Sequence, residues 1–429
     1  MSEQSAPISE LAWRELLFQH TEGLQAAFAA GQVTGYCGFD PTASSLHVGN
    51  LVPVMGLVHL QRAGHRPIAL VGGGTGMIGD PSGRNSERTL QTLETIAENA
   101  EAIRRQLAKF LDFEGPNAAR LLNNADWLTK LSLLDFLRDT GKHFSINYML
   151  AKDSVKSRLE SGLSFTEFSY MLLQAHDFLE LHQREGVTLQ IGGSDQWGNI
   201  TAGLELIRRT TGGDAHALTF PLITNADGSK FGKSTGGGSV WLDPARTSPY
   251  KFYQFWIGAD DRDVSRYLRF FTLLDRATIE ALDQAVRTAP EQREAQRALA
   301  TEVTTRVHGA DAARVAQEVS ALLFEKADPQ ALSDAALEAL RLEIPFATYA
   351  ASVDGPALSE GVDVYECLTA LGVAASRGAA KRLLEQGGVS VNGTKLSAAD
   401  RLIGQERLLR GRHLLLKKGA REFGLVQVP

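Results

Sequence analysis

Residues 34–50 read TGYCGFDPTASSLHVGN, an apolar run that passes through a polar turn into the start of a helical pattern. Three later runs have the same apolar character: PIALVGGG (67–74), VTLQIGGSD (187–195) and ALTFPLIT (217–224). Amphipathic stretches lie between the runs, at residues 50–63, 90–111, 131–139 and 166–181. Strands that alternate with helices in this order predict an α/β fold with a parallel sheet covered on both faces. Such a sheet binds ligands at the carboxyl ends of its strands, at a switch point.

The rest of the 429 residues changes character twice, and the length favours about three domains. We expect a sheet domain over residues 1–247 and a helical domain over 248–323, where strand signals give way to helix formers and charge. Residues 324–361 have the composition of a linker with some helix. Residues 362–429 predict a small domain with a helix that carries Arg377 and Lys381, then a hairpin turning at Asn392–Gly393.

Net charge divides the chain in the same way. Taken over the whole chain, the formal charge of −6 argues against a nucleic-acid binder, because such proteins are usually basic. Residues 362–429 hold eleven basic and six acidic residues, so this tail carries +5 and the other 361 residues carry −11. Two cysteines exclude a disulfide framework. No stretch has the composition of a signal peptide or a membrane span, so we expect a cytoplasmic protein that does not contact a membrane.

Two glycine motifs suggest nucleotide sites and fail on inspection. GTGMIG (74–79) fits the dinucleotide fingerprint, but Asp80 stands where the pyrophosphate of NAD would meet a helix N-terminus. GKS (232–234) ends like a phosphate-binding P-loop, but that motif requires glycine at position 227, which is Asp227 here. An NAD-dependent oxidoreductase therefore remains only as a weak alternative.

A stronger signal is a pair of segments that flank the sheet domain. LHVGN (46–50) opens a helix and offers His47 and helix-start amides. KFGKS (230–234) offers Lys230 and Lys233 in a loop rich in glycine and serine. Taken singly, each has an ordinary reading, as a helix-start histidine and a solvated loop. Together they can hold a triphosphate and stabilise the charge that develops as pyrophosphate leaves.

These segments resemble the HIGH and KMSKS signatures of class I aminoacyl-tRNA synthetases. The blocks YCGFDPTASSLHVGN, GDPSGRNSERTL, NYMLAKDSV, LQIGGSDQWGNITAG and KFGKS together resemble the bacterial tyrosyl-tRNA synthetase family, and the resemblance extends over essentially the whole chain. It implies a Rossmann-like catalytic domain, an α-helical domain on the anticodon side and an α+β S4-like RNA-binding domain. Asn50 departs from the second histidine of HIGH, and Phe231 and Gly232 depart from the methionine and serine of KMSKS.

The resemblance also implies a tyrosine pocket. Tyr36 and Asp177 would bind the phenolic hydroxyl, and Gln196 would position the carboxylate. Asp80, Tyr170 and Gln174 would hold the α-ammonium, which explains an acid at the end of the glycine run. Tyr170, Gln174 and Asp177 stand at i, i+4 and i+7 of a predicted helix, a spacing that places them on one face.

The implied ATP contacts are Cys37, Gly38, Asp40, Gly49, Asn50, Gly193, Asp195 and Lys233. The catalytic groups would be Thr42, His47, Lys230, Lys233, Ser234, Arg84 and Arg88, which act on the leaving phosphates. Magnesium is expected on those phosphates, with no metal site in the protein. Cys37 has no basic neighbour and is expected to pack rather than to react.

The expected partners are L-tyrosine, ATP and tRNA(Tyr), with Arg377, Lys381 and Arg382 on the tRNA and a second copy of the chain in a homodimer. The region 127–157 is a candidate for the apolar dimer interface. A tryptophanyl-tRNA synthetase shares the architecture, and Tyr36 with Asp177 favours tyrosine over tryptophan. A non-enzymatic RNA-binding protein is the third alternative, and the intact signatures speak against it.

Overall fold

The computed structural model describes residues 7–82, 91–152, 155–156, 162–233, 236–350, 358–419 and 422–429. The chain forms two compact units. The first contains residues 1–248 and 255–307, and the second contains residues 249–254 and 308–429. Helix α11 (Pro249–Ile257) contributes to both units. No helix in these described ranges is long and apolar enough to cross a membrane.

The first unit is built on a six-stranded sheet, counted over the described part of the chain, in the order β1-β6-β5-β2-β3-β4. The strands are β1 (Gln19–His20), β2 (Thr34–Phe39), β3 (Arg66–Val71), β4 (Arg120–Asn123), β5 (Leu189–Gly193) and β6 (His216–Phe220). All neighbours pair in parallel except β1, which pairs antiparallel to β6. The four predicted strands are confirmed. The edge strands β1 and β4 were not predicted, because they are too short to carry a pattern.

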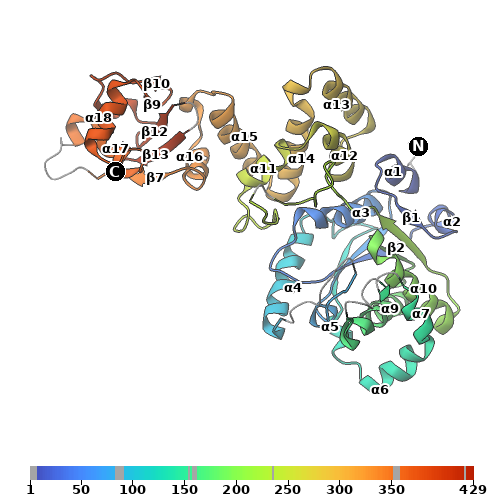
Figure 1. Ribbon diagram of the computed structural model, residues 1–429. Helices are drawn as coiled ribbons and strands as arrows, with labels where there is room; N and C mark the ends of the chain where they lie inside the picture. Colours follow the sequence, from blue (N-terminus) through green and yellow to red (C-terminus); the bar gives the residue numbers. More distant parts are fainter. Residues whose placement is uncertain are drawn as a thin grey trace. The chain divides into compact units, whose positions relative to one another are not determined.

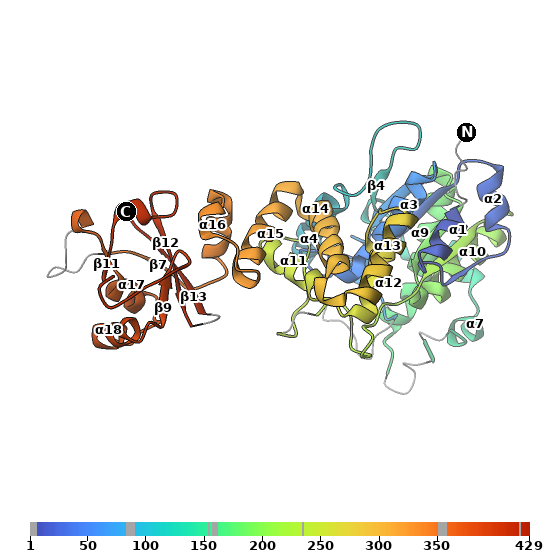
Figure 2. The same cartoon turned by 90° about the horizontal axis from the view of Figure 1, so that it is seen from above.

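Helices cover both faces of this sheet, as the apolar runs predicted. On one face, Tyr36, Ile68 and Leu70 pack in one cluster with residues of α9 (Phe165–Glu185) and α10 (Trp197–Thr211). These two helices lie side by side in both views (Figure 1 and Figure 2). Helix α3 (Leu51–Arg62) packs against β2, β3 and β5 and approaches β6 closely, because a Cβ on Gly56 would lie 2.1 Å from the Phe220 ring.

The remaining elements of the first unit are mostly helical. They are α1 (Pro7–Trp13), α2 (Leu24–Ala30), α4 (Leu93–Leu107), α5 (Ala125–Leu128), α6 (Leu133–Asp135), α7 (Ile146–Leu150), α12 (Asp261–Phe271), α13 (Arg276–Thr288) and α14 (Glu294–His308). The helix expected at 131–139 is shorter than predicted, since α6 passes into a π-helical turn, η3 (Phe136–Thr140).

The second unit joins helices to a five-stranded sheet within the described ranges, in the order β10-β9-β12-β13-β7. Its strands are β7 (Phe346–Thr348), β8 (Val362–Asp363), β9 (Val389–Val391), β10 (Thr394–Lys395), β11 (Leu402–Ile403), β12 (His413–Lys418) and β13 (Glu422–Gln427), of which β8 and β11 form a separate pair. Its helices are α15 (Ala310–Phe324), α16 (Asp334–Arg341), α17 (Val364–Ala370) and α18 (Arg377–Glu385).

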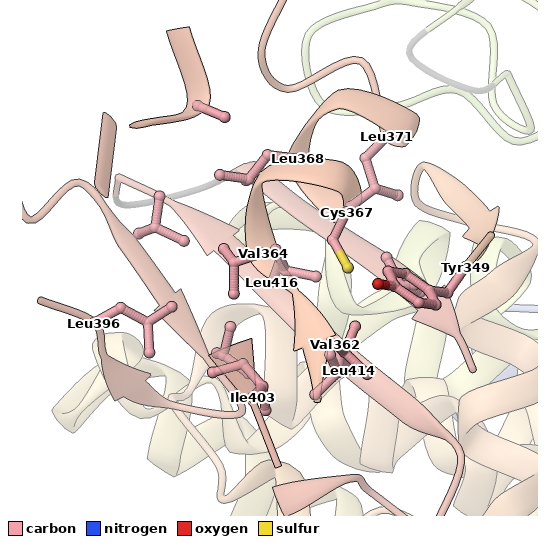
Figure 3. Packing of buried hydrophobic residues seen from close by; sticks show 14 of the residues in the cluster. Tyr349, Val362, Val364, Cys367, Leu368, Leu371, Leu396, Ile403, Leu414 and Leu416 are labelled. Carbon is pink, nitrogen blue, oxygen red and sulfur yellow. The ribbon is translucent and has the colours of Figure 1, made fainter. Parts of the chain in front are cut away.

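Two cores hold the second unit together. Figure 3 shows Leu368 and Cys367 of α17 packed with Leu414 and Leu416 of β12. A second cluster joins Val319 and Leu322 of α15 and three leucines of 332–340 to Leu409, Leu415 and Leu425. The predicted hairpin is confirmed, with positive φ at Asn392 (49°) and Gly393 (83°). The segment expected as a linker also contains the strand β7, which pairs with β13.

Candidate active site

The candidate site lies where the strand order of the first sheet reverses. Strand β2 leads to β3 and β4 on one side and pairs with β5 on the other, so the carboxyl ends of β2 and β5 flank the switch point. Asp40 follows β2, and Gly193 ends β5 directly before Asp195 and Gln196 in the turn η5 (Ser194–Gln196). Four residues that the sequence assigned to one site, namely Asp40, Gly193, Asp195 and Gln196, therefore lie at the edge where a ligand is expected.

One end of the site holds a buried carboxylate with fixed orientation. Asp177 on α9 accepts a hydrogen bond from Asn124 Nδ2 at 2.8 Å and another from Trp127 Nε1 at 2.7 Å. Burial raises the pKa of Asp177 to about 7, against the lowering effect of these two hydrogen bonds. Burying this carboxyl group is unfavourable, and both of its oxygens are held in place. Such a group is positioned to accept a hydrogen bond from a ligand.

Beside it lies a hydroxyl group that the protein leaves unpaired. Tyr36 is 1% exposed, and its hydroxyl has no hydrogen-bond partner among the described residues. Its ring packs edge-on against Phe178 at 5.3 Å. Burial and the nearby Asp177 raise the pKa of Tyr36 well above its usual value, so the hydroxyl keeps its proton. A buried hydroxyl without a partner costs free energy unless a ligand supplies one.

The other end of the site is a polar network around two acids. Asp80 accepts hydrogen bonds from Gln196 Nε2 at 2.7 Å and from the Ser82 amide at 2.9 Å. Asn199 Nδ2 lies 3.1 Å from Gln174 Oε1 and 3.3 Å from Gln196 Oε1, which joins both glutamines to Asp80. The structure thus brings together three of the predicted tyrosine-pocket residues from a strand-end loop and two helices.

Asp40 is the centre of a second part of this network. Tyr170 donates to Asp40 Oδ2 at 2.8 Å, and Thr75 donates to Oδ1 at 2.7 Å. Asn124 connects Thr75 (3.0 Å) to Asp177, so the network is continuous from Asp177 to Tyr170. Gly72 must lack a side chain here, since a Cβ would lie 2.1 Å from Asp40 Oδ1.

Cys37 and Asp195 lie at the same strand ends. Burial raises the pKa of the Cys37 thiol to about 12, so it is not a nucleophile at neutral pH. Burial also raises the pKa of Asp195, and Asp80 raises it further. Gly38 is exposed on β2, whereas its neighbours Cys37 and Phe39 are buried.

His47 caps the short helix η1 (Val48–Asn50) in a defined tautomer. Its Nδ1 accepts from the Gly49 amide at 3.1 Å, and its own amide donates to Asn50 Oδ1 at 3.0 Å. Because Nδ1 is an acceptor, the proton of the neutral ring is on Nε2. Burial, with Lys230 and Lys233 nearby, lowers the pKa of His47, so the neutral form is the one present at pH 7.

The lysine loop runs along this segment. Val240 accepts from the Val48 amide at 3.0 Å, and Leu46 accepts from the Leu242 amide at 2.9 Å. Lys233 forms an isolated β-bridge with Ser239, and its ammonium lies 3.3 Å from the Ser239 hydroxyl. Residues 239–242 therefore connect the LHVGN segment (46–50) on one side to Lys233 of the KFGKS segment on the other. Thr42 follows Asp40 in the preceding turn, where its amide donates to the Asp40 carbonyl. Ser234, Arg84 and Arg88 lie outside the described residues.

The predicted tRNA contacts belong to the second unit. Arg377 begins α18 and donates to Asp363 and Glu366, each at 2.9 Å, so two acids balance its charge. Asp363, which is fully buried, also accepts from Arg401 at 2.7 Å. Lys381 and Arg382 are exposed on α18. Of the three predicted contacts, Arg377 has the most structural role.

Sequence reasoning missed several residues of the site. Asn124, Trp127, Thr75 and Asn199 all donate to predicted pocket residues, and Gln190 is a buried neighbour of Tyr36 on β5 whose Oε1 has no partner in the described chain. The available signal was the asparagine pair Asn123–Asn124, at the end of the unpredicted strand β4.

Comparisons with known proteins agree with this geometry. The family described as tRNA synthetases class I (W and Y) matches residues 29–325, and the tyrosine--tRNA ligase SYY-like C-terminal domain matches residues 348–426. The tyrosine--tRNA ligase of Anaeromyxobacter dehalogenans is 55% identical over 421 residues, which is 98% of this chain and 99% of that relative. The tyrosine--tRNA ligase of Bacillus caldotenax is 51% identical over 426 residues, with the same coverage.

Solved structures give the same result. A C-terminally truncated mitochondrial tyrosyl-tRNA synthetase of Aspergillus nidulans has a TM-score of 0.69 and 31% identity, and the match covers 75% of this chain and 95% of that one. A tryptophanyl-tRNA synthetase of Encephalitozoon cuniculi, at 15% identity and a TM-score of 0.54, covers 72% and 87% and shares the fold. The chain belongs to the tyrosyl-tRNA synthetases, within the class I aminoacyl-tRNA synthetase family.

Proposed function

We propose that the site at the switch point activates L-tyrosine with ATP to tyrosyl-adenylate and then transfers the tyrosyl group to the terminal ribose of tRNA(Tyr). The observation that carries the proposal is the unpaired hydroxyl of Tyr36 beside the oriented carboxylate of Asp177. A phenol needs one acceptor and one donor, and this pair offers both. Tyrosine-dependent exchange of pyrophosphate into ATP tests the proposal.

Substrate binding follows from the two ends of the site. The phenol of tyrosine donates to Asp177 and accepts from Tyr36. The α-ammonium binds the acidic network of Asp80, Tyr170 and Gln174, and Gln196 orients the carboxylate. Phenylalanine would leave the buried polar groups of this site unpaired, so the site discriminates against it; tyrosyl-tRNA synthetase is the standard illustration of this rule.

The first step is an attack of the tyrosine carboxylate on the α-phosphorus of ATP. The carboxylate is already an anion, so the step needs positioning and charge stabilisation rather than a protein base. His47 donates from Nε2 to the leaving phosphates, and Lys230 and Lys233 balance their growing charge. Thr42, Ser234, Arg84 and Arg88 are assigned to the same task, and Mg²⁺ enters on the phosphates as part of the substrate.

The nucleoside of ATP is assigned to the strand ends. We place Cys37, Gly38, Asp40, Gly193 and Asp195 around it, with Gly49 and Asn50 at the helix start. Support comes from the position of Asp40 and Asp195 directly after β2 and β5, the strands that flank the switch point.

We assign the transfer to the tRNA end to the site in the first unit, and contacts with tRNA phosphates to the second unit. The tail from 362 carries a net charge of +5, as expected of a surface that binds phosphates. Arg377, Lys381 and Arg382 are all exposed on α18. Arg377 pairs with two acids and Lys381 pairs with Glu385 at 3.8 Å, so Arg382, which has no ion pair among the described residues, is the best supported of the three. We retain the division at residues 247, 323 and 361 as a proposal for functional domains, and a cytoplasmic location because tRNA is charged there.

A homodimer is supported by an exposed apolar surface. Large apolar side chains stand exposed on α6, η3, α7 and the first residue of α9, namely Leu133, Leu134, Leu137, Ile146 and Phe165. This surface overlaps the 127–157 region expected from the sequence. A group of exposed apolar residues in one region more often marks an interaction site than a surface that stays in contact with water.

Activation of tryptophan is the alternative that shares this fold. An indole has no acceptor for the Tyr36 hydroxyl, so a bound tryptophan would leave that hydroxyl buried and unpaired. Exchange assays with each amino acid separate the two substrates.

A further inference from the structure

Phe231 stands between Lys230 and Lys233, yet its side chain is buried in the protein. It is 7% exposed, whereas both lysines are exposed. Its ring stacks on Phe271 at 5.5 Å with an interplanar angle of 10° and lies 5.1 Å from the ring of Tyr267, both on α12. Phe255 and Trp256 on α11 complete the contact, at 5.7 and 6.0 Å. The loop is thus anchored at its centre in an aromatic cluster.

The backbone next to Phe231 connects this anchor to His47. The Gly232 carbonyl accepts from the Val240 amide at 3.0 Å, and the Val240 carbonyl accepts from the Val48 amide at 3.0 Å. Gly232 has φ +83°, and a Cβ there would lie 3.0 Å from Val48 Cγ2, so the chain bends tightly against the His47 segment. Residues 232–233, 239–242 and 46–48 therefore pair side by side, next to the buried ring of Phe231.

The beginning of the loop has its own attachments, so the anchor has a separate purpose. Tyr267 donates to Asn225 Oδ1 at 2.8 Å, and Asp263 accepts from the Ala226 amide at 3.0 Å. These bonds fix the loop on α12 at residues 225 and 226. Further along the loop, isolated β-bridges join Lys230 to Thr224 and Lys233 to Ser239, and between these two backbone contacts the buried side chain is the ring of Phe231.

We propose that Phe231 is a positioning residue, which holds Lys230 and Lys233 at the distance from His47 that the leaving pyrophosphate requires. This inference rests on the proposed function for the roles of the lysines. Phe231 touches no substrate and acts through its neighbours. A displacement of about 1 Å at reacting groups can slow a reaction about 100-fold, so an anchor of this kind affects rate more than binding.

The test compares three variants of the full chain. Phe231→Ala removes the anchor, and Phe231→Met keeps an apolar side chain of similar volume in the cluster. Phe270→Leu is the matched control, because Phe270 is fully buried on α12 and contacts Phe271, but is absent from the ring contacts of Phe231 in the described chain. We expect Phe231→Ala to form tyrosyl-adenylate about 10- to 100-fold more slowly at saturating ATP, with an unchanged Kd for tyrosine.

The controls separate positioning from stability. Phe231→Met is expected to restore the rate to within about threefold, since volume-conserving swaps are tolerated best. Phe270→Leu is expected to lower the melting temperature without slowing adenylate formation. Equal slowing in Phe270→Leu and Phe231→Ala, or an unchanged rate in Phe231→Ala, would overturn the proposal.

A double-mutant cycle examines whether Phe231 acts through the lysines. In a Lys230→Ala/Lys233→Ala background, adding Phe231→Ala should cost no further rate, because the groups that it positions are gone. Independent, multiplying effects would contradict the proposal.

A second readout does not depend on catalysis. Burial lowers the pKa of His47 and the two lysines lower it further, so displacement of the lysines in Phe231→Ala should raise the pKa of the His47 ring signal in NMR titrations. An unchanged His47 titration in Phe231→Ala counts against the inference even if the unaltered chain were inactive. Failure of the unaltered chain in tyrosine-dependent exchange counts against the proposed function instead.

Discussion

The indole nitrogen of Trp127 donates to Oδ1 of Asp177 at 2.7 Å and holds one oxygen of this buried carboxylate. Asn124 holds the other oxygen. Neither donor neutralises the charge, and burial leaves the pKa of Asp177 at about 7. The acid to which we assign the phenol of tyrosine therefore titrates in the range where the protein is assayed.

This titration predicts a pH dependence of tyrosine binding. Asp177 is half protonated near pH 7, and a phenol that donates to it favours the ionised form. Protons therefore compete with tyrosine, and affinity should rise about tenfold from pH 6 to pH 8 by linkage. Calorimetric titration of tyrosine into the unaltered chain and into Asp177→Asn measures it. A dependence that persists in Asp177→Asn would assign the titration to another group.

Removing the Tyr36 hydroxyl should change stability and specificity in opposite directions. In the unliganded protein this hydroxyl has no partner in the described chain, so Tyr36→Phe should raise the free energy of unfolding by about 1 kcal/mol. With tyrosine bound, one hydrogen bond is lost, and kcat/KM for tyrosine should fall by about fivefold. Activity with phenylalanine should stay the same. Urea unfolding and exchange assays measure both, and a destabilised Tyr36→Phe would contradict this account.

His47 has two functions that substitutions can separate. His47→Asn can still accept from the Gly49 amide as a helix cap, but it places no donor where Nε2 stands. We expect adenylate formation to slow by about 100-fold in both His47→Asn and Lys233→Ala, with tyrosine binding unchanged. Rapid quench measurements of the first turnover give the rate. A normal rate in both variants would remove these residues from the mechanism.

The boundary of the second unit determines how the tail can be removed. A cut at residue 361 deletes Leu409, Leu415 and Leu425 and uncovers the apolar face of α16 that they cover. A chain ending at residue 325 also removes the three leucines of 332–340, so that Val319 and Leu322 of α15 are what it leaves uncovered of this buried cluster. We expect residues 1–325 to catalyse tyrosine-dependent exchange at a normal rate and to charge tRNA poorly, whereas residues 1–361 should aggregate. Full tRNA charging by 1–325 would exclude the tail from tRNA binding.

The exposed apolar surface predicts the behaviour of a charged variant. Phe165 is 78% exposed at the start of α9, so Phe165→Asp costs the isolated chain little and should weaken an apolar dimer interface strongly. Sedimentation should show a dimer for the unaltered chain and a larger monomer fraction for Phe165→Asp. Lys109→Asp, which reverses a charge at an exposed residue just after α4 and outside the 127–165 surface, is the control. A monomeric unaltered chain would exclude the dimer.

The sequence predicted the parts of this enzyme that carry their own pattern. Strands β2, β3, β5 and β6 are five or six residues long and mostly apolar, so each has a recognisable pattern. The signatures at 46–50 and 230–234 are each made of consecutive residues, so they too can be read from the sequence. Strands β1 and β4 are formed by pairing, since two to four residues carry no period. Asn124 and Trp127 reach Asp177 across about fifty residues, and Phe231 is an anchor only because α11 and α12 fold against it. Such contacts depend on tertiary structure.

The most direct test of the account is exchange of labelled pyrophosphate into ATP by the unaltered full chain, measured with tyrosine, tryptophan and phenylalanine at pH 8. The account predicts exchange that requires tyrosine and is far slower with either other amino acid, because only tyrosine satisfies both Tyr36 and Asp177. Equal exchange with tryptophan, or none with tyrosine, would contradict it.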